Sequence, residues 1–382
     1  MEECFLPHRA TALVDTAAIA ENFRLLAAHC RQERPQSSAK HAPFRLISVV
    51  KADAYGHGVA LVVPALLAAG CDFFAVATLE EALTVRALAP AADILILGYT
   101  PPQEALTLSR ARLLQTVLSE CYATALHKEA LKISRTVSVH IKLDGGMCRL
   151  GLSPDDPAAL LRIFALKQLH PAGLYTHFPS ADTDLVATRY ALSRFLACKQ
   201  TLEKAGARLF CHAAASAALL RLPKALLDGA RPGLALYGIP PAETPLPLRP
   251  AMQLVAPIVL VREVPAGTPV GYGGSFVTTR PARIGVCPIG YADGLPRAAE
   301  VLSLRVIHGK TTFSVPVAGH ICMDQTMLDL TGTPAAVGDT VVFLSDPRPI
   351  AAACGTIPYE ILTAVSRRVK RIPKELYHDR LL

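Results

Sequence analysis

Lys51 is the residue whose type and setting most directly suggest chemistry. It follows the apolar run ISVV at 47–50 and precedes the segment ADAYGHG at 52–58. A lysine at the end of a strand is ordinarily a solvated surface residue. Here an apolar wall, polar neighbours and a tight turn surround it, and desolvation favours the neutral amine. Because a neutral amine can form an imine with an aldehyde, we predict that Lys51 bonds covalently to a carbonyl group.

The elements that would position Lys51 alternate between short apolar runs and longer helix-like stretches. Helices are predicted at 78–90, 119–131, 156–167 and 184–205. The strands are predicted at 46–50, 73–76, 93–97, 113–117, 137–142, 172–176, 208–212 and 233–237. Eight such alternations are typical of a (β/α)8 TIM-type barrel, which places catalytic groups at the carboxyl ends of its strands. An open doubly wound sheet is the alternative, but GxGxxG is absent after the first strand.

The pattern changes near residue 250. Short β-type runs separated by glycine and proline follow, with few helical stretches. We therefore predict an α/β chain with a barrel domain at 12–250 and a mainly β C-terminal domain at 251–382. The segment 1–11 can add a strand to the second domain.

The composition of the 382-residue chain excludes several classes of protein. Apolar residues make up 51% and charged residues 18%, which excludes a disordered chain. The least polar stretch, 59–77, is interrupted by proline, glycine and aspartate, and the N-terminus does not resemble a signal peptide. We expect a cytoplasmic protein that does not enter a membrane. Ten cysteines without CxxC pairs predict reduced thiols, and we predict no metal site.

The net charge of +8 is modest, and its densest basic run lies at 367–374. Because no aromatic residues alternate with these charges, we predict a solvated chain end rather than a nucleic-acid surface. A mildly basic enzyme for anionic small molecules fits equally well.

Eight segments, taken together, resemble the motifs of the alanine racemase family and occur in the family's order. They are VKADAYGHG at 50–58, IKLDGGMCRLG at 141–151, YTHF at 175–178, ARPGLALYG at 230–238, GYG at 271–273, GYADG at 290–294, GHICMDQ at 319–325 and PYEI at 358–361. The resemblance implies a barrel followed by a β domain, pyridoxal 5'-phosphate (PLP) as cofactor and alanine as substrate. It also implies a homodimer whose active sites take residues from both chains, and D-alanine supply for peptidoglycan.

The resemblance also assigns two bases. Lys51 would hold PLP and act on one face of the substrate α-carbon, while Tyr272 of the partner subunit would act on the other. Racemisation removes a proton from one side and returns it to the other, so two bases must flank the carbon. His177 would be the hydrogen-bond partner of Tyr272, with Arg231 behind it. Arg231 would also face the pyridine nitrogen of PLP and keep it unprotonated, which limits transamination.

The remaining residues follow from the same resemblance. Arg149 would contact the cofactor's phenolic oxygen and the substrate carboxylate, and Lys142 matches a lysine that is carbamylated in many family members. The alternative for Lys142 is an ordinary inward-facing lysine paired with Asp144. The phosphate site would comprise Tyr55, Ser216, Gly233, Leu234 and Tyr359. The partner subunit's Tyr291, Met323 and Asp324 would complete the substrate site.

Two positions depart from the family pattern. Ala215 in HAAAS at 212–216 stands where asparagine is common, and Gly145 stands where threonine is usual. A lost hydrogen bond near the phosphate is worth about 0.5–1.5 kcal/mol, which would loosen the cofactor without abolishing binding.

Two other classes remain as alternatives. A non-catalytic PLP carrier would have the barrel alone, without a β domain or a counterpart of Tyr272. A barrel-type decarboxylase of basic amino acids usually has a CysAspGly-type motif in its β domain, which this chain lacks. Within racemases, Tyr359 and Tyr291 favour alanine. Serine is only one hydroxyl larger, and an apolar pocket rejects such an analogue by roughly 10²-fold at best.

Overall fold

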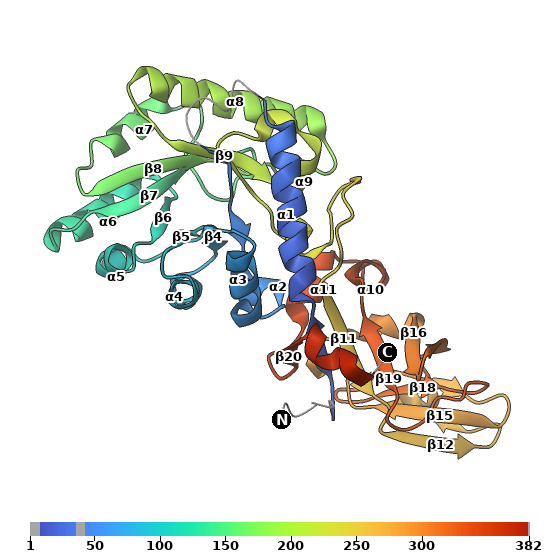
Figure 1. Ribbon diagram of the computed structural model, residues 1–382. Helices are drawn as coiled ribbons and strands as arrows, with labels where there is room; N and C mark the ends of the chain where they lie inside the picture. The colour runs from blue at the N-terminus through green and yellow to red at the C-terminus, as the bar shows by residue number, and fades with distance from the viewer. Residues whose placement is uncertain (1–7, 36–42, 381–382) are drawn as a thin grey trace. The chain divides into compact units, whose positions relative to one another are not determined.

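The computed structural model describes residues 8–35 and 43–380, which form two compact units (Figure 1). One unit comprises Ile19–Ala54 and Val62–Arg249 and contains the barrel. The other comprises the chain up to Ala18, Tyr55–Leu61 and the part from Pro250 onward. Of the segment 1–11, residues 1–7 lie outside the described residues.

The barrel unit is built on a parallel sheet that closes on itself. Its strand order is β2-β10-β9-β8-β7-β6-β5-β4-β3. The strands are β2 (Arg45–Leu46), β3 (Ser48–Val49), β4 (Phe73–Val76), β5 (Asp93–Ile96), β6 (Leu114–Val117), β7 (Val137–Lys142), β8 (Leu169–Tyr175), β9 (Phe210–Ala215) and β10 (Gly229–Arg231). The two ends of the sheet, β2 and β3, are pieces of one strand interrupted at Ile47, whose N–H donates to the carbonyl of Ala230 at 2.8 Å. The predicted (β/α)8 barrel is confirmed, with its first strand in two pieces.

Helices cover the outside of these strands (Figure 1). They are α1 (Thr16–Glu33), α3 (Val59–Ala68), α4 (Leu79–Leu88), α5 (Ala105–Arg110), α6 (Glu120–Lys132), α7 (Pro157–Phe164), α8 (Leu185–Lys204) and α9 (Ser216–Arg221). Side chains fix several helix starts. A capping box of Thr78 and Glu81 begins α4, and aspartates at 156 and 184 cap α7 and α8. Because helices cover the outer face and side chains fill the inside, strands such as β4 are apolar and buried throughout.

One predicted barrel strand was wrong. The run 233–237 is not a strand, because Leu234–Tyr237 form a 3-10 helix and the eighth strand is the preceding β10. Pro232 follows β10 directly and has no N–H to continue the ladder. The helix is as fully buried as a barrel strand, so an apolar run could not distinguish the two.

The C-terminal unit is mainly β, as predicted. A six-stranded sheet has the order β17-β16-β19-β11-β1-β20, and two small sheets pair β12-β15-β18 and β13-β14. The strands of the large sheet are β1 (Thr11–Val14), β11 (Met252–Pro257), β16 (Ser303–His308), β17 (Thr311–Pro316), β19 (Thr340–Leu344) and β20 (Lys370–Pro373). The others are β12 (Leu260–Val264), β13 (Pro269–Val270), β14 (Phe276–Val277), β15 (Ala282–Cys287) and β18 (Thr326–Asp329). Two helices, α10 (Pro347–Cys354) and α11 (Pro358–Ala364), precede β20.

The basic run at 367–374 is only partly the solvated chain end that was predicted. Arg367, Arg368 and Lys370 are exposed, whereas Arg371 and Lys374 are half-buried and have partners within this unit. Arg371 donates to four backbone carbonyls, those of Gly56, Val365, Ser366 and Val369, at 2.6–3.0 Å. Lys374 pairs with an aspartate that precedes α1, at 3.3 Å. Side-chain periodicity could not reveal these partners, since most are main-chain oxygens, and Gly56 and Asp15 lie more than 300 positions away in the sequence.

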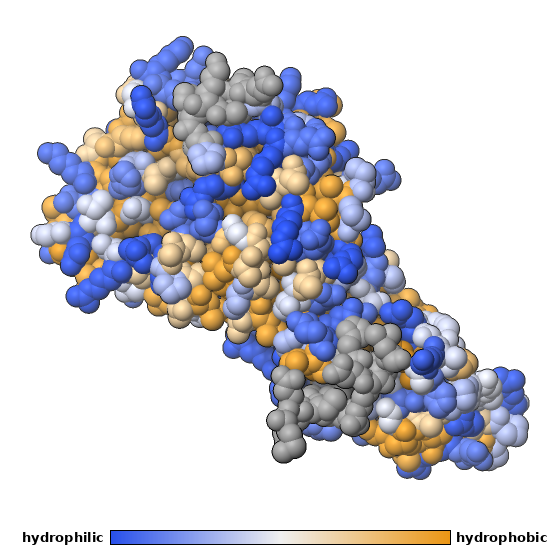
Figure 2. Space-filling model, in the orientation of Figure 1, coloured by the Kyte–Doolittle hydropathy of each residue, from blue (hydrophilic) through white to orange (hydrophobic). Residues whose placement is uncertain are grey.

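No helix among the described residues is long and apolar enough to cross a membrane. On the visible face, hydrophobic and hydrophilic side chains are interspersed (Figure 2).

Candidate active site

Lys51 ends the first barrel strand and begins a left-handed turn. The four residues after it all have φ between +52° and +55°, and none is glycine. Each such residue costs roughly 1–2 kcal/mol relative to the right-handed conformation. Hydrogen bonds hold the turn, from Ala52 N–H to Glu81 Oε1 at 2.7 Å and from Ala54 N–H to the Val50 carbonyl at 2.9 Å. Strained backbone held in this way is common at functional sites.

The amine of Lys51 is half-buried and unpaired. Within the described part of the chain, its Nζ has no hydrogen-bond acceptor and no ion pair. Burial and the nearby charge of Arg149 lower the pKa of Lys51, while Glu81 opposes them. Lys51 is therefore more easily deprotonated than a solvated lysine, as predicted for a nucleophilic amine.

Four cations meet around one histidine at this end of the barrel. Burial, together with the charges of Arg231, Arg149, Lys142 and Lys51, lowers the pKa of His177 to about 3. His177 is therefore neutral at physiological pH. In the described parts of the chain none of the four cations forms an ion pair with a carboxylate. Such a cluster is suited to hold an anionic ligand.

Arg231 is buried and held by acceptors on the neighbouring strand ends. One terminal nitrogen donates to His212 Nδ1 at 2.6 Å and to the His212 carbonyl at 3.0 Å. The other donates to the carbonyls of Thr176 at 2.5 Å and Ala213 at 3.1 Å. Its fifth N–H, on Nε, has no acceptor among the described residues. Arg231 therefore keeps one donor for a ligand.

Lys142 lies inside the barrel, but it does not form the ion pair with Asp144 that the alternative interpretation predicted. Its side chain is buried, and its Nζ lies 6.0 Å from the ring centroid of Tyr175. Asp144 instead accepts hydrogen bonds from the N–H groups of Met147 and Cys148 at 3.1 and 3.2 Å. Burial lowers the pKa of Lys142 to about 8, with help from Arg149. The pairing of Lys142 with Asp144 is not found.

Gly145 begins the loop that carries Arg149, and its lack of a side chain has a local reason. A Cβ at this position would lie 2.2 Å from the carbonyl oxygen of His177 and 3.0 Å from Thr176 Oγ1. The loop therefore lies directly on the end of β8. A threonine at 145 would require the loop and the end of β8 to move apart. Glycine at this position therefore permits the close packing of the two segments.

Two of the predicted phosphate residues of the barrel unit are in contact. Ser216 Oγ accepts from Gly233 N–H at 2.9 Å and from Ala235 N–H at 3.4 Å. Ala215 occupies the N-cap of α9, and no side chain caps that helix. An asparagine there could supply such a cap, which is typically worth about 1 kcal/mol.

The two tyrosines of the predicted phosphate site come together in the C-terminal unit. The ring centroids of Tyr55 and Tyr359 lie 6.0 Å apart at 45°. Burial raises the pKa of Tyr55, so its hydroxyl stays protonated and can donate. Residues more than 300 positions apart in the sequence thus share one location.

The remaining predicted residues lie at the surface of the C-terminal unit. Tyr272 is 74% exposed, Tyr291 44% and Met323 53%. Tyr291 N–H donates to the Cys322 carbonyl at 3.0 Å, which brings Tyr291 beside Met323. Tyr272 begins a short turn and has its ring in solvent in the single chain.

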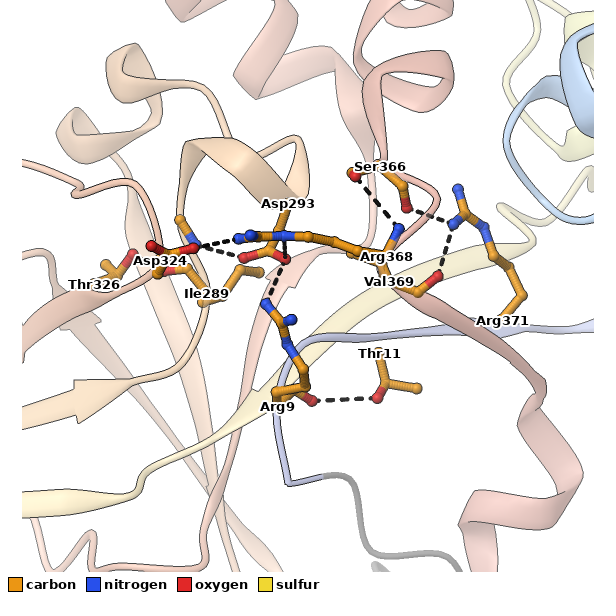
Figure 3. A network of polar contacts seen from close by, with 11 residues as sticks. Arg9, Thr11, Ile289, Asp293, Asp324, Thr326, Ser366, Arg368, Val369 and Arg371 are labelled. Carbon is orange, nitrogen blue, oxygen red and sulfur yellow. Dashed lines mark hydrogen bonds and ion pairs between the residues drawn. The ribbon is translucent and has the colours of Figure 1, made fainter.

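A buried carboxylate organises this region (Figure 3). Asp293 is fully buried, and its Oδ1 accepts from Arg9 and from Arg368, each at 2.8 Å. Its Oδ2 accepts from Gly290 N–H at 3.0 Å. Arg368 also pairs with Asp324 at 2.7 Å. The network therefore joins the predicted substrate residue Asp324 to the loop that carries Tyr291.

Replacing Asp293 by asparagine is expected to destabilise the C-terminal unit by about 1.5–3 kcal/mol, because the buried carboxylate loses its charged hydrogen bonds to Arg9 and Arg368, whose side chains are about one-third exposed. Urea unfolding followed by circular dichroism measures the change. The control is Glu300→Gln, which removes a half-exposed partner of His320 in the same unit and should cost less than about 1 kcal/mol. Equal small losses in both variants would show that Asp293 is not a structural centre.

Several residues of the site were not predicted. His140 and His212 support Arg231, Tyr175 stacks on His212 with ring centroids 4.8 Å apart, and Arg368 orients Asp324. His140 precedes Lys142 by two positions on β7, so strand alternation could have placed both side chains on the inner face. No pattern in the sequence connects Arg368 to its partners.

Comparisons with known proteins agree with these features. The pattern described as "Alanine racemase, N-terminal domain" matches residues 14–241, and "Alanine racemase, C-terminal domain" matches residues 251–373. The alanine racemase of Desulfovibrio desulfuricans is 41% identical over 335 residues, which are 85% of this chain and 90% of that relative.

Solved structures give the same result. The biosynthetic alanine racemase from Pseudomonas aeruginosa matches with a TM-score of 0.80 and 36% identity, over 96% of this chain and 99% of that one. The alanine racemase from Bartonella henselae with covalently bound pyridoxal phosphate matches with a TM-score of 0.83 and 29% identity, over 96% of this chain and all of that one. Both domains, in order and nearly complete, are therefore accounted for, and this chain belongs to the alanine racemase family.

Proposed function

We propose that this protein interconverts L-alanine and D-alanine with PLP as cofactor, as a homodimer with shared active sites. The observation that carries the proposal is the group of unpaired cations around Lys51 at the carboxyl end of the barrel. Membership of the alanine racemase family supports the reaction, and the covalently bound PLP of the Bartonella henselae relative supports the cofactor.

The residues present fit the cofactor. Lys51 offers an unpaired amine for its aldehyde, and Arg231 keeps an uncommitted Nε–H for its ring nitrogen. The phosphate would be held by hydroxyl and N–H groups of Tyr55, Ser216, Gly233, Leu234 and Tyr359. When bound, PLP supplies electron withdrawal from the α-carbon of the amino acid.

Two bases then move the proton. Lys51 takes or returns it on one face of the α-carbon, and its lowered pKa makes the neutral amine accessible. Tyr272 of the partner subunit does the same on the opposite face. Burial and the surrounding cations keep His177 neutral, so its ring can form a hydrogen bond with the Tyr272 hydroxyl. The exposure of Tyr272 in the single chain is consistent with a place in another subunit's site.

The substrate would be oriented by its carboxylate. Arg149 supplies a positive charge, and Met323 of the partner subunit supplies a backbone N–H. Asp324 is fixed by Arg368 and holds the loop that presents Met323. Tyr359 and the partner subunit's Tyr291 limit the space for the side chain to about a methyl group, which favours alanine.

The proposed role in the cell is D-alanine supply for peptidoglycan. Expression of this chain in a bacterium that lacks alanine racemase should permit growth without added D-alanine. An inactive Lys51→Ala variant expressed to the same level is the control. If the wild-type chain accumulates in folded form but growth still needs D-alanine, this role is wrong.

We further propose that Lys142 is carbamylated. The buried amine reacts with CO2 to give a carbamate and a proton, and the new anion would lie among Arg149 and Arg231. A pKa of about 8 leaves a sizeable neutral fraction near physiological pH, which the reaction requires. Protein equilibrated with ¹³C-labelled bicarbonate should show a protein-bound carbamate resonance, and removal of CO2 should lower activity.

The matched control for this experiment is Lys142→Ala. It should lack the carbamate resonance and should have a low activity that does not respond to CO2. A resonance of equal intensity in Lys142→Ala, or a wild-type activity unaffected by complete CO2 removal, would contradict the modification.

A further inference from the structure

Arg231 is held by a chain of two buried histidines. His212 on β9 contacts Arg231 through Nδ1 at 2.6 Å and contacts His140 on β7 through Nε2 at 2.9 Å. Both histidines are at most 2% exposed, and Arg231 is 4% exposed. Neither histidine has a role in the mechanism proposed above.

The chemistry of the three side chains fixes the direction of the hydrogen bonds that join Arg231, His212 and His140. A guanidinium only donates, so His212 Nδ1 must be unprotonated and accept from Arg231. The proton of the neutral ring is then on Nε2, which donates to Nδ1 of His140. His140 in turn carries its proton on Nε2. Burial lowers the pKa of His140 to about 3 and that of His212 well below its usual value, which agrees with two neutral rings.

Two local features of the barrel make room for the ring of His140. The pairing of β7 with β8 shifts between Val139 and His140, so that Val139 pairs with Pro171 and His140 with Gly173. Such a bulge re-aims a side chain. A Cβ at Gly173 would lie 2.5 Å from the His140 ring, so a larger residue would displace that ring.

Aromatic packing fixes the second ring. Tyr175 stacks on His212 with a 4.8 Å centroid separation and an interplanar angle of 5°. Its hydroxyl lies 2.9 Å from Thr116 Oγ1, and the Arg231 guanidinium lies 5.1 Å from its ring centroid. The orientation of Arg231 is therefore determined from strands β7, β8 and β9 together.

No carboxylate contacts Arg231 within the described ranges, so its charge is not compensated. All four terminal N–H groups are used by the ring nitrogen and three carbonyls. Only Nε–H is left to donate, and neutral acceptors leave the guanidinium with its full positive charge.

We propose that His212 and His140 are positioning residues that aim the Nε–H of Arg231 while leaving its positive charge intact. This inference rests on the proposed function, in which that N–H faces the ring nitrogen of PLP. A charged partner in place of His212 would offset the guanidinium charge and so favour protonation of the ring nitrogen. The neutral histidine pair thereby controls which reaction follows, favouring racemisation over transamination.

The sharpest test compares His212→Asn with His212→Asp in the PLP-loaded enzyme. Both side chains present an oxygen where Nδ1 accepts from Arg231, and they differ only in charge. His212→Asn should stay within about threefold of wild-type kcat. His212→Asp should fold equally well but lose about 10- to 100-fold in kcat, with the KM for alanine little changed. It should also lose the visible absorbance of bound PLP faster during turnover.

A second pair of variants tests the outer histidine. His140→Asn keeps an acceptor for His212 Nε2–H, whereas His140→Leu removes it. His140→Asn should retain wild-type kcat and spectrum. His140→Leu should leave His212 without an acceptor and should therefore lower kcat. Thermal unfolding of all four variants, with and without PLP, separates loss of folding from loss of positioning.

Isotope-labelled histidine gives a readout that does not depend on activity. In ¹⁵N-histidine protein, the two buried rings, assigned through the asparagine variants, should each show an unprotonated Nδ1 and a protonated Nε2. An Nδ1–H on His212, or identical kinetics and spectra for His212→Asn and His212→Asp, would overturn the inference. Failure of the wild-type protein to racemise alanine would instead overturn the proposed function and leave the tautomer result standing.

Discussion

Replacing Lys51 by alanine should lower alanine racemisation by about 10²- to 10⁴-fold, because the amine is both a proposed base and the proposed attachment point of PLP. Lys51 ends the first barrel strand, its amine is unpaired, and burial and Arg149 lower its pKa. Initial rates of D-alanine formation measure the loss. Dialysis should also remove PLP from the variant more readily than from the wild type.

Lys142 provides the matched control, since it is the other lysine at this end of the barrel with a lowered pKa. Borohydride reduction of the PLP-loaded protein should label the Lys51 peptide in both the wild type and Lys142→Ala. No label should be fixed in Lys51→Ala. A label on the Lys142 peptide of the wild-type protein would contradict the assignment of Lys51.

Replacing Tyr272 by phenylalanine should separate the two faces of the reaction. Racemisation should fall by about 10²- to 10⁴-fold in both directions, because each direction needs both bases. Exchange of the α-proton with deuterated solvent should behave differently. The enantiomer that meets Lys51 should still exchange, whereas exchange from the enantiomer that meets Tyr272 should be lost. Proton NMR of each enantiomer incubated separately in D2O measures this asymmetry.

Tyr291→Phe is the control, because Tyr291 is also an exposed tyrosine of the C-terminal unit but is proposed only to limit the space for the substrate. Its exchange should remain similar for the two enantiomers, and its KM should change more than its kcat. An equal, mild loss of exchange from both enantiomers in Tyr272→Phe would contradict the two-base scheme.

The barrel could be predicted because its strands and helices have different periods. Apolar runs such as FFAV at 73–76 lie between stretches with helical spacing, and the structure confirms them as β4 and the helices around it. The eighth strand could not be placed in the same way. Leu234–Tyr237 is as apolar as a strand but forms a 3-10 helix after Pro232. Burial alone gives both conformations the same sequence pattern.

The residues of the candidate site were predicted from motifs, whereas the contacts that hold them could not be predicted from the sequence. The left-handed turn after Lys51 contains alanines, an aspartate and a tyrosine, so local preference would not suggest four positive φ values in succession. The turn persists because distant groups such as Glu81 hold it. The contact of Gly145 with the His177 backbone likewise depends on segments that meet only in the folded barrel.

The most direct test of the central proposal is a single assay on the purified protein. The wild-type chain, loaded with PLP and separated from free cofactor, is incubated with L-alanine, while its visible spectrum and the D-alanine formed are followed in the same sample. The proposal predicts a protein-bound visible band and conversion towards equal amounts of the two enantiomers, both lost in Lys51→Ala. A folded protein that binds PLP but forms no D-alanine would contradict it.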